Sequence, residues 1–144
     1  MFLEEKLDRL QSYLSPDDLV IRFTEFKSIM SKIEAKFLSS EDLNYHYNGW
    51  IVRLKDFEDF AYEQSTFDYL EGMLDKDKKY WWIYVNGPEP NSRHYVFDAT
   101  LKGGRSLSYV FPGGVMYIVH KKYDWMFLLN REEKTGKRRI LKNE

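Results

Sequence analysis

Three histidines are the side chains of this chain best suited to bind a metal ion or to transfer protons near neutral pH. They are His46, His94 and His120. None has a second histidine at the i+2 or i+4 spacing that is typical of a metal site. His120 ends an apolar run beside two lysines, and we interpret it as a surface residue at a hairpin turn. We therefore expect no metal site and no cofactor.

Nucleophilic and phosphate-binding motifs are missing from the sequence. No serine lies in a Gly-x-Ser-x-Gly elbow. The stretch Gly103-Gly104-Arg105-Ser106 is rich in glycine but lacks the Lys-Ser/Thr pair of a phosphate loop. We interpret it as a loop that bends between two strands. The chain has no cysteine, which excludes disulfides, thiolate zinc sites and cysteine nucleophiles.

Carboxylates are the most plentiful reactive groups, and one cluster consists of Asp56, Glu58 and Asp59. Paired acids can perform acid–base catalysis when burial separates their pKa values. Nothing in the sequence indicates such burial, so the cluster is either a solvated acidic face or a surface that attracts a basic partner. Were the protein an enzyme with dispersed acids, Asp98 and Asp124 would be the first residues to test.

Charge divides the chain into two unlike halves. Residues 1–79 contain 17 Asp and Glu against 11 Lys and Arg, whereas residues 80–144 contain 6 against 11. Basic residues near the C-terminus could contact phosphates. However, Glu132 and Glu133 interrupt them and the pI is only about 6.3, and charge on an edge strand also deters aggregation. The sequence therefore argues against nucleic-acid binding.

Composition indicates one folded domain over residues 1–144. The chain is 43% hydrophobic and 31% charged, and it contains 11 Tyr, 10 Phe and 4 Trp. The N-terminal residues lack the pattern of a signal peptide, and no apolar stretch is long enough to span a membrane. We expect a cytoplasmic protein with no membrane contact.

The first 79 residues are predicted to be mainly helical. Leu3, Leu7, Leu10 and Leu14 share one helical face. Ser15-Pro16-Asp17-Asp18 is typical of a helix start, and an apolar stripe follows from Leu19 to Phe37. This stripe suits a helix packed on a sheet or a coiled-coil seam, and its length favours the sheet. Asn48-Gly49 is predicted to form a turn, and Trp50–Leu54 could be a short strand. Residues 56–62 are predicted to be helical, and Ser65 is predicted to cap a further helix.

Residues 80–144 are predicted to form strands, because apolar residues there alternate or run continuously between turn signals. Tyr80–Val85, Tyr95–Asp98, Val115–His120, Trp125–Asn130 and Lys137–Leu141 are the expected strands. Residues 106–111 could be a loop or a short strand, and residues 86–91 are predicted to be a turn. The fold class is therefore α+β, with N-terminal helices packed on one face of a four- to five-stranded, mainly antiparallel sheet.

Alternation along the first of these strands places Tyr80, Trp82 and Tyr84 on one side. If the helices leave that side open, the aromatic rings form an interaction site. If the helices cover it, the rings belong to the core. The sequence does not decide which face is covered, nor the oligomeric state.

The segment Val115-Met-Tyr-Ile-Val-His-Lys-Lys-Tyr-Asp-Trp125-Met-Phe-Leu-Leu-Asn130 resembles the closing hairpin of small bacterial proteins of the toxin-immunity type, including the SUKH-like group. Leu54-Lys55-Asp56-Phe57 fits the same arrangement, and the resemblance covers about residues 50–130. It implies a helix-then-sheet layout and a toxin as partner. Relatives carry a histidine pair after the last apolar strand, where this chain has Asn130-Arg131, so no activity of those histidines is implied.

Together these features favour a non-enzymatic protein-binding domain, in its specific form an immunity protein that neutralises a toxin by occlusion. We expect a protein partner with a basic surface, bound by Asp56, Glu58, Asp59, Trp82 and Tyr84. The alternative is a domain that binds a small ligand or single-stranded nucleic acid on an aromatic sheet face.

Overall fold

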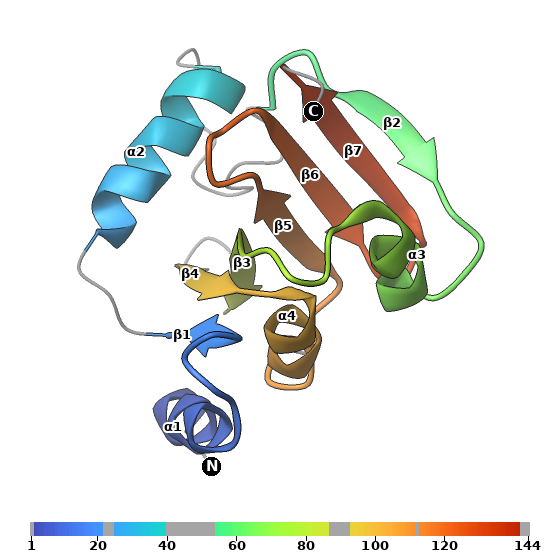
Figure 1. The fold of residues 1–144 in the computed structure, drawn as a ribbon. Helices are drawn as coiled ribbons and strands as arrows, with labels where there is room; N and C mark the ends of the chain where they lie inside the picture. The colour runs from blue at the N-terminus through green and yellow to red at the C-terminus, as the bar shows by residue number, and fades with distance from the viewer. Residues whose placement is uncertain (1, 22–24, 40–53, 87–92, 112, 142–144) are drawn as a thin grey trace.

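Strands from both halves of the chain meet in one sheet. The computed structural model describes residues 2–21, 25–39, 54–86, 93–111 and 113–141. Its sheet has seven strands in the order β1-β4-β3-β5-β6-β7-β2, and every neighbouring pair is antiparallel (Figure 1). The strands are β1 (Leu19–Val20), β2 (Glu58–Ala61), β3 (Tyr80–Asn86), β4 (Arg93–Ala99), β5 (Val115–Val119), β6 (Trp125–Asn130) and β7 (Thr135–Ile140).

The α+β class and the antiparallel sheet are confirmed, but the strand count is larger than predicted. The five strands of residues 80–144 all form. Two short strands of the first half, β1 and β2, then add to the two edges of the sheet by pairing with β4 and β7. Residues 56–62 were predicted to be helical, and β2 corrects this. The apolar spacing of these residues is compatible with a helix or a strand, and their pairing with β7 makes them a strand.

The helices are interspersed with the strands instead of preceding them. They are α1 (Leu3–Tyr13), α2 (Phe26–Phe37), α3 (Thr66–Met73) and α4 (Leu101–Ser108). The prediction of a loop or strand between β4 and β5 is wrong, because α4 lies there. The predicted Ser65 cap is confirmed, since its hydroxyl accepts a hydrogen bond from the Asp68 amide at 3.3 Å.

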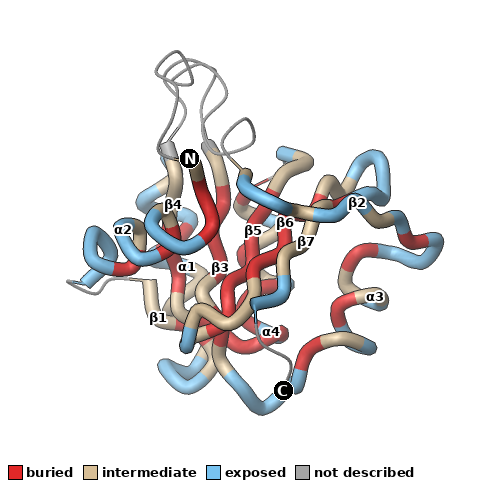
Figure 2. Tube along the Cα trace, turned by 90° about the horizontal axis from the view of Figure 1, so that it is seen from above, coloured by how far each residue is buried: buried red, intermediate tan, exposed pale blue. Residues whose placement is uncertain are grey.

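Helices cover both faces of the sheet, which corrects the expectation of one covered face. On one face, Tyr80, Trp82 and Tyr84 share a core cluster with residues of α1, α3 and α4. On the other face, Ile83 and Tyr117 pack with the α2 residues Ile29, Ile33 and Phe37. The part of the apolar stripe that lies in α2 packs on the sheet, as predicted. The helix start predicted at Ser15-Pro16-Asp17-Asp18 is wrong, because β1 follows those residues and pairs with β4, and α2 begins only at Phe26. Figure 2 shows the buried residues in red along the central strands.

Trp82 and Tyr84 are core residues, so their expected contribution to a partner-binding surface is wrong. Both side chains are 0% exposed. The Trp82 indole N–H donates to the Ala99 carbonyl at 2.9 Å, and the Tyr84 hydroxyl donates to the Gly104 carbonyl at 2.8 Å. Burial raises the pKa of the Tyr84 phenol well above its usual value. No open aromatic face remains there to stack on a nucleic-acid base.

The glycine pair of α4 allows this helix to approach the sheet closely. A Cβ on Gly104 would lie 2.5 Å from the indole ring of Trp82, and one on Gly103 would overlap the Asp18 carbonyl oxygen. The missing side chains explain why a helix forms at Gly103-Gly104, where glycine alone disfavours helix. The interpretation of this pair as a bend between strands is therefore wrong.

Some predicted features fall outside the described residues. These are His46, the turn at Asn48-Gly49, most of the possible strand Trp50–Leu54 and most of the turn at residues 86–91. Leu54 itself is described and forms an isolated bridge with Leu38. Within the described part of the chain, no helix is long and apolar enough to cross a membrane.

Candidate protein-binding surface

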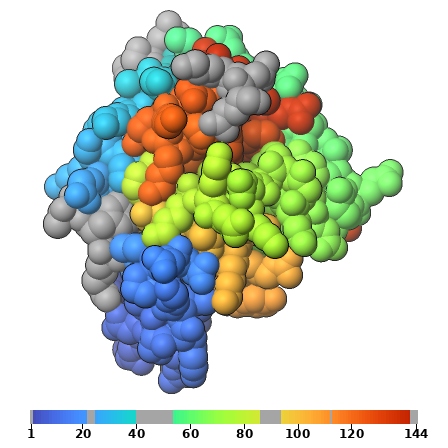
Figure 3. Space-filling view, viewed as in Figure 1, coloured from blue at the N-terminus to red at the C-terminus, as the bar shows by residue number. Residues whose placement is uncertain are grey.

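A groove lies between α1 and the C-terminal end of α4, and we call it the α1–α4 groove. Four α1 residues line one side, at i, i+3, i+4 and i+7 spacing that places them on one helical face: Lys6, Arg9, Leu10 and Tyr13. The other side is lined by Ser106, Tyr109 and Val110. The volume of the groove is about 330 Å³. In the space-filling view, the blue surface of the N-terminal segment borders the orange surface of the α4 segment (Figure 3).

Hydrogen bonds hold both walls of this groove in place. On α1, the Gln11 side-chain amide donates to the Leu19 carbonyl at 2.7 Å and accepts from the Ile21 amide at 3.2 Å. Gln11 therefore ties α1 to the chain around β1. Beyond α4, the Arg131 guanidinium donates to the Phe111 carbonyl at 2.6 Å. These contacts fix the helices that carry the lining residues.

Apolar and aromatic side chains of the groove lining are Leu10, Val110, Tyr13 and Tyr109. Leu7 is buried in the core, whereas Leu10 packs against the core and also lines the groove. Tyr13 and Tyr109 are 78% and 82% exposed. Tyrosine is enriched at protein interfaces, because it offers a large apolar area and a polar tip. An exposed aromatic pair beside a partly covered apolar stripe is therefore typical of a contact surface.

The charge of the α1–α4 groove is positive. Among the described residues that line it, Lys6 and Arg9 are cationic and none is acidic. The cations of α4, Lys102 and Arg105, line a separate hollow that also contains carboxylates. The Arg105 guanidinium lies 5.5 Å from the centre of the Phe67 ring. The cations that a partner meets in the groove itself therefore come from α1.

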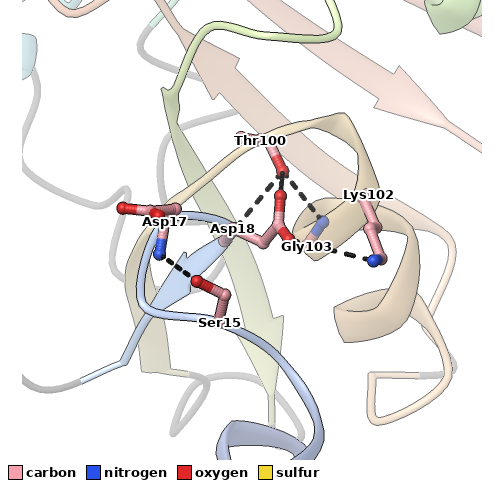
Figure 4. Close-up of polar contacts among 6 residues, drawn as sticks. All are labelled: Ser15, Asp17, Asp18, Thr100, Lys102 and Gly103. Carbon is pink, nitrogen blue, oxygen red and sulfur yellow. Dashed lines mark hydrogen bonds and ion pairs between the residues drawn. The ribbon is translucent and has the colours of Figure 1, made fainter.

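A second, polar hollow of about 560 Å³ lies at the other end of α4. It is lined by residues of both charges: Asp18, Glu71, Lys76, Asp77, Leu101, Lys102 and Arg105. Figure 4 shows how Asp18 is held there. Its carboxylate accepts a hydrogen bond from the Thr100 hydroxyl at 2.9 Å and lies 3.9 Å from the Lys102 ammonium. Asp18 is thus occupied in joining the turn before β1 to α4.

Thr100 has a further role as the N-cap of α4. Its hydroxyl accepts from the Gly103 amide at 3.4 Å, and its own amide donates to the Asp18 carbonyl at 3.0 Å. The side chain is 5% exposed. We therefore assign the polar contacts of this hollow to the structure of the β1–α4 junction.

The predicted acidic cluster is exposed, but two of its members are already paired. The Asp59 carboxylate lies 2.6 Å from the Lys137 ammonium, and the Glu58 carboxylate lies 2.7 Å from the Arg138 guanidinium. The hydrogen bond from Glu58 raises the pKa of Arg138. Asp56 is exposed just before β2 and has a left-handed backbone with φ 59°. Glu58 and Asp59 therefore form two cross-strand ion pairs, with the acidic residues on β2 and the basic residues on β7.

Three ion pairs join the two unlike halves of the sequence. Asp18, Glu58 and Asp59 come from the acidic first half, and their partners Lys102, Arg138 and Lys137 come from the basic second half. Because β1 and β2 join a sheet built by the second half, the unlike halves are neighbours in space. These three acidic residues thus contribute to contacts within the chain.

The two candidates for an acid-based activity, Asp98 and Asp124, each contact a residue at the turn between β5 and β6. His120 Nδ1 lies 3.5 Å from an Asp124 oxygen, and the Asp98 carboxylate lies 2.7 Å from the Lys121 ammonium. Lys121 also lies 3.9 Å from the centre of the Trp81 ring. None of these residues lines either hollow. The contacts fix the turn, in which Tyr123 has a left-handed backbone with φ 60°.

The interpretation of His120 as a surface residue is wrong. It is 6% exposed, and its ring stacks on Trp125 at 5.5 Å between centres. The i+4 spacing from His120 to Asp124 is a sequence signal that could have found their contact. Within the described residues, no group of three His, Cys, Asp or Glu side chains is arranged to hold a metal ion.

Sequence reasoning missed the residues of the α1–α4 groove. The spacing of Lys6, Arg9, Leu10 and Tyr13 was available as a signal, but it lies beside the stronger leucine stripe. Tyr109 could not be placed, because its segment was read as a loop or strand. Only the packing of α4 beside α1 brings the two tyrosines to one groove.

A family model described as a family of unknown function, DUF6756, matches residues 12–143. No curated protein and no solved structure matches the chain. The match covers α2, α3, α4, the whole sheet and the end of α1.

Proposed function

Because the chain belongs to the DUF6756 family, whose function is unknown, we propose from its surface that it is a non-enzymatic protein-binding domain that engages its partner at the α1–α4 groove. One observation carries the proposal. Tyr13, in α1, and Tyr109, the residue that follows α4, are 78% and 82% exposed, yet both line the same groove. Tyrosine and arginine are the residue types that most often dominate binding energy at interfaces.

The specific form of the proposal is an immunity protein that neutralises a toxin by occluding it. The resemblance of residues 115–130 to immunity proteins supports this form. The groove offers a surface for such a partner. The side chains at the turn between β5 and β6 are paired with one another or with β4, so we assign them a structural role. The partner's identity is then testable through the neighbouring gene on the chromosome, because a toxin and its immunity protein are expected to be encoded together.

The experiment measures binding of the full chain to the product of the adjacent gene by isothermal titration calorimetry. We expect a defined complex, and we expect Tyr13→Ala and Tyr109→Ala each to weaken it by about tenfold or more. Both side chains are exposed, so neither change should alter the circular dichroism spectrum. Co-expression should also rescue cells from the toxicity of that product.

Phe26→Ala is the matched control. Phe26 is an exposed aromatic, 47% accessible, but it belongs to α2, which covers the opposite face of the sheet. Its removal should leave the affinity unchanged. The absence of both binding and rescue would overturn the immunity form, and a complex that is insensitive to both tyrosine changes would overturn the assignment of the groove.

A further inference from the structure

We infer that the α1–α4 groove takes an acidic amphipathic segment of the partner protein, whose apolar side chains enter the groove while its carboxylates meet Lys6 and Arg9. This inference rests on the proposed function and specifies the chemistry of the partner. The acidic composition of the first half suggests a basic partner, whereas this inference proposes an acidic one. Two properties of the groove support it, namely its charge and its shape.

Charge complementarity is the first argument. Lys6 and Arg9 are separated by one helical turn of α1, so both can face the same bound segment. The described lining of the groove contains no carboxylate that would repel an acidic segment. A basic segment would instead meet like charge, which costs binding energy and slows encounter.

Two of the three clustered acidic residues that suggested a basic partner lie elsewhere and are engaged. Glu58 and Asp59 pair with Arg138 and Lys137 at the β2 edge of the sheet. Asp18, the acidic residue of the neighbouring hollow, is held by Thr100 and Lys102. A basic partner would have to compete with these contacts, whereas an acidic segment at the groove would not.

Shape is the second argument. A volume of about 330 Å³ is near the lower end of the range for ligand pockets, roughly 300–1,000 Å³. A groove of this volume can hold a few side chains of a partner, but not a broad protein surface. Leu10 and Val110 provide apolar contact, and Tyr13 and Tyr109 add aromatic rings. This combination is suited to a short segment that presents apolar anchors on one side, as in helix-in-groove recognition.

The test selects ligands without assuming a partner. The full chain is immobilised and used to enrich a displayed library of short random peptides. We expect the enriched peptides to combine apolar anchors with net negative charge. The best synthetic peptide should then bind more weakly as salt is raised, because its contacts with Lys6 and Arg9 are screened. Enriched peptides of neutral or positive net charge, or no enrichment, would overturn the inference.

Charge reversal provides the matched comparison. Lys6→Glu combined with Arg9→Glu should weaken binding of that peptide by about tenfold or more. Lys27→Glu combined with Lys122→Glu makes the same change in net charge at exposed positions that do not line the groove, and should have little effect. Equal effects of the two double variants would contradict a local role of Lys6 and Arg9.

The outcomes also separate this inference from the proposed function. If Tyr109→Ala weakens partner binding but the Lys6/Arg9 reversal does not, the binding domain stands and the acidic segment is wrong. Self-association that Tyr109→Ala abolishes would assign the groove to a second copy of the chain. Binding of anionic lipid vesicles that needs Lys6 and Arg9, with no enriched peptide, would assign it to a membrane surface. Either result overturns the inference.

Discussion

The side chain of Trp82 occupies the space that a Cβ on Gly104 would need. The nearest ring atoms of Trp82 would lie 2.5 Å from that Cβ. Trp82 is itself fixed by its hydrogen bond to the Ala99 carbonyl, so the ring cannot move without losing that bond. By contrast, a Cβ on Gly72, in α3, would meet nothing within 4 Å.

These two glycines therefore predict opposite effects of the same substitution. Gly104→Ala should lower the free energy of unfolding by about 1–3 kcal/mol, because it overpacks the core. Gly72→Ala should raise it by roughly 0.5–1 kcal/mol, because alanine favours helix and no neighbour obstructs it. Urea denaturation of both variants measures the difference. A Gly104→Ala protein as stable as the unsubstituted chain would contradict the packing of α4 against Trp82.

His94 is predicted to make the fold sensitive to acid. Burial lowers the pKa of its imidazole from 6.5 to about 4. Below pH 6.5 the unfolded chain binds a proton at this site that the folded chain does not bind until about pH 4. The free energy of unfolding therefore carries no penalty from His94 above pH 6.5, and it declines as the pH falls towards 4, by roughly 3 kcal/mol in total.

His94→Gln removes the titrating group and tests this account. The free energy of unfolding, measured by urea denaturation at about pH 7 and about pH 4.5, should fall less in the variant than in the unsubstituted protein. The comparison uses the difference between the two pH values, so any constant cost of the substitution cancels. An unchanged pH dependence would show that folding does not lower the pKa of His94.

The start of α4 depends on one hydroxyl that serves two elements. Thr100 caps the helix at the Gly103 amide and donates to Asp18 beside β1. We expect Thr100→Val, which keeps the shape but lacks the hydroxyl, to cost about 1–2 kcal/mol of unfolding free energy. Thr100→Ser keeps the hydroxyl and should cost clearly less. Equal losses in the two variants would indicate that packing, and not hydrogen bonding, fixes this helix end.

Over the whole molecule, the two halves of the chain depend on each other. β1 and β2 belong to residues 1–79, but their partners β4 and β7 belong to residues 80–144. The ion pairs Asp18–Lys102, Glu58–Arg138 and Asp59–Lys137 cross the same division. The helices of the first half also bury their apolar residues on strands of the second half.

A fragment of residues 1–79 should therefore remain unfolded on its own, because it lacks the sheet that buries its helices. Its amide proton spectrum should show the narrow dispersion of an unfolded chain. Addition of a fragment of residues 80–144 should restore dispersion, and added salt should weaken that recovery because the ion pairs are screened. A well-dispersed spectrum of residues 1–79 alone would contradict this interdependence.

The local pattern of residues was enough to locate most of the regular structure. The apolar runs at residues 115–120 and 125–130 correspond to β5 and β6, and the leucine spacing near the N-terminus corresponds to α1. The Ser65 cap and the change to strands at Tyr80 were also found. These features depend on residues close together in the chain, so the period of the pattern reveals them.

Contacts between distant residues decided the rest. The Gly103-Gly104 pair lies in a helix so close to Trp82 and Asp18 that no side chain would fit there. Residues 58–61 form a strand because β7 pairs with them. Trp82 and Tyr84 are buried because α1, α3 and α4 cover their face. Alternation within a strand shows which residues share a face, but not which face is covered. In the same way, the composition gives the number of charged residues but not which of them pair. Only the tertiary structure shows that Glu58 and Asp59 are paired and that Lys6 and Arg9 line a groove.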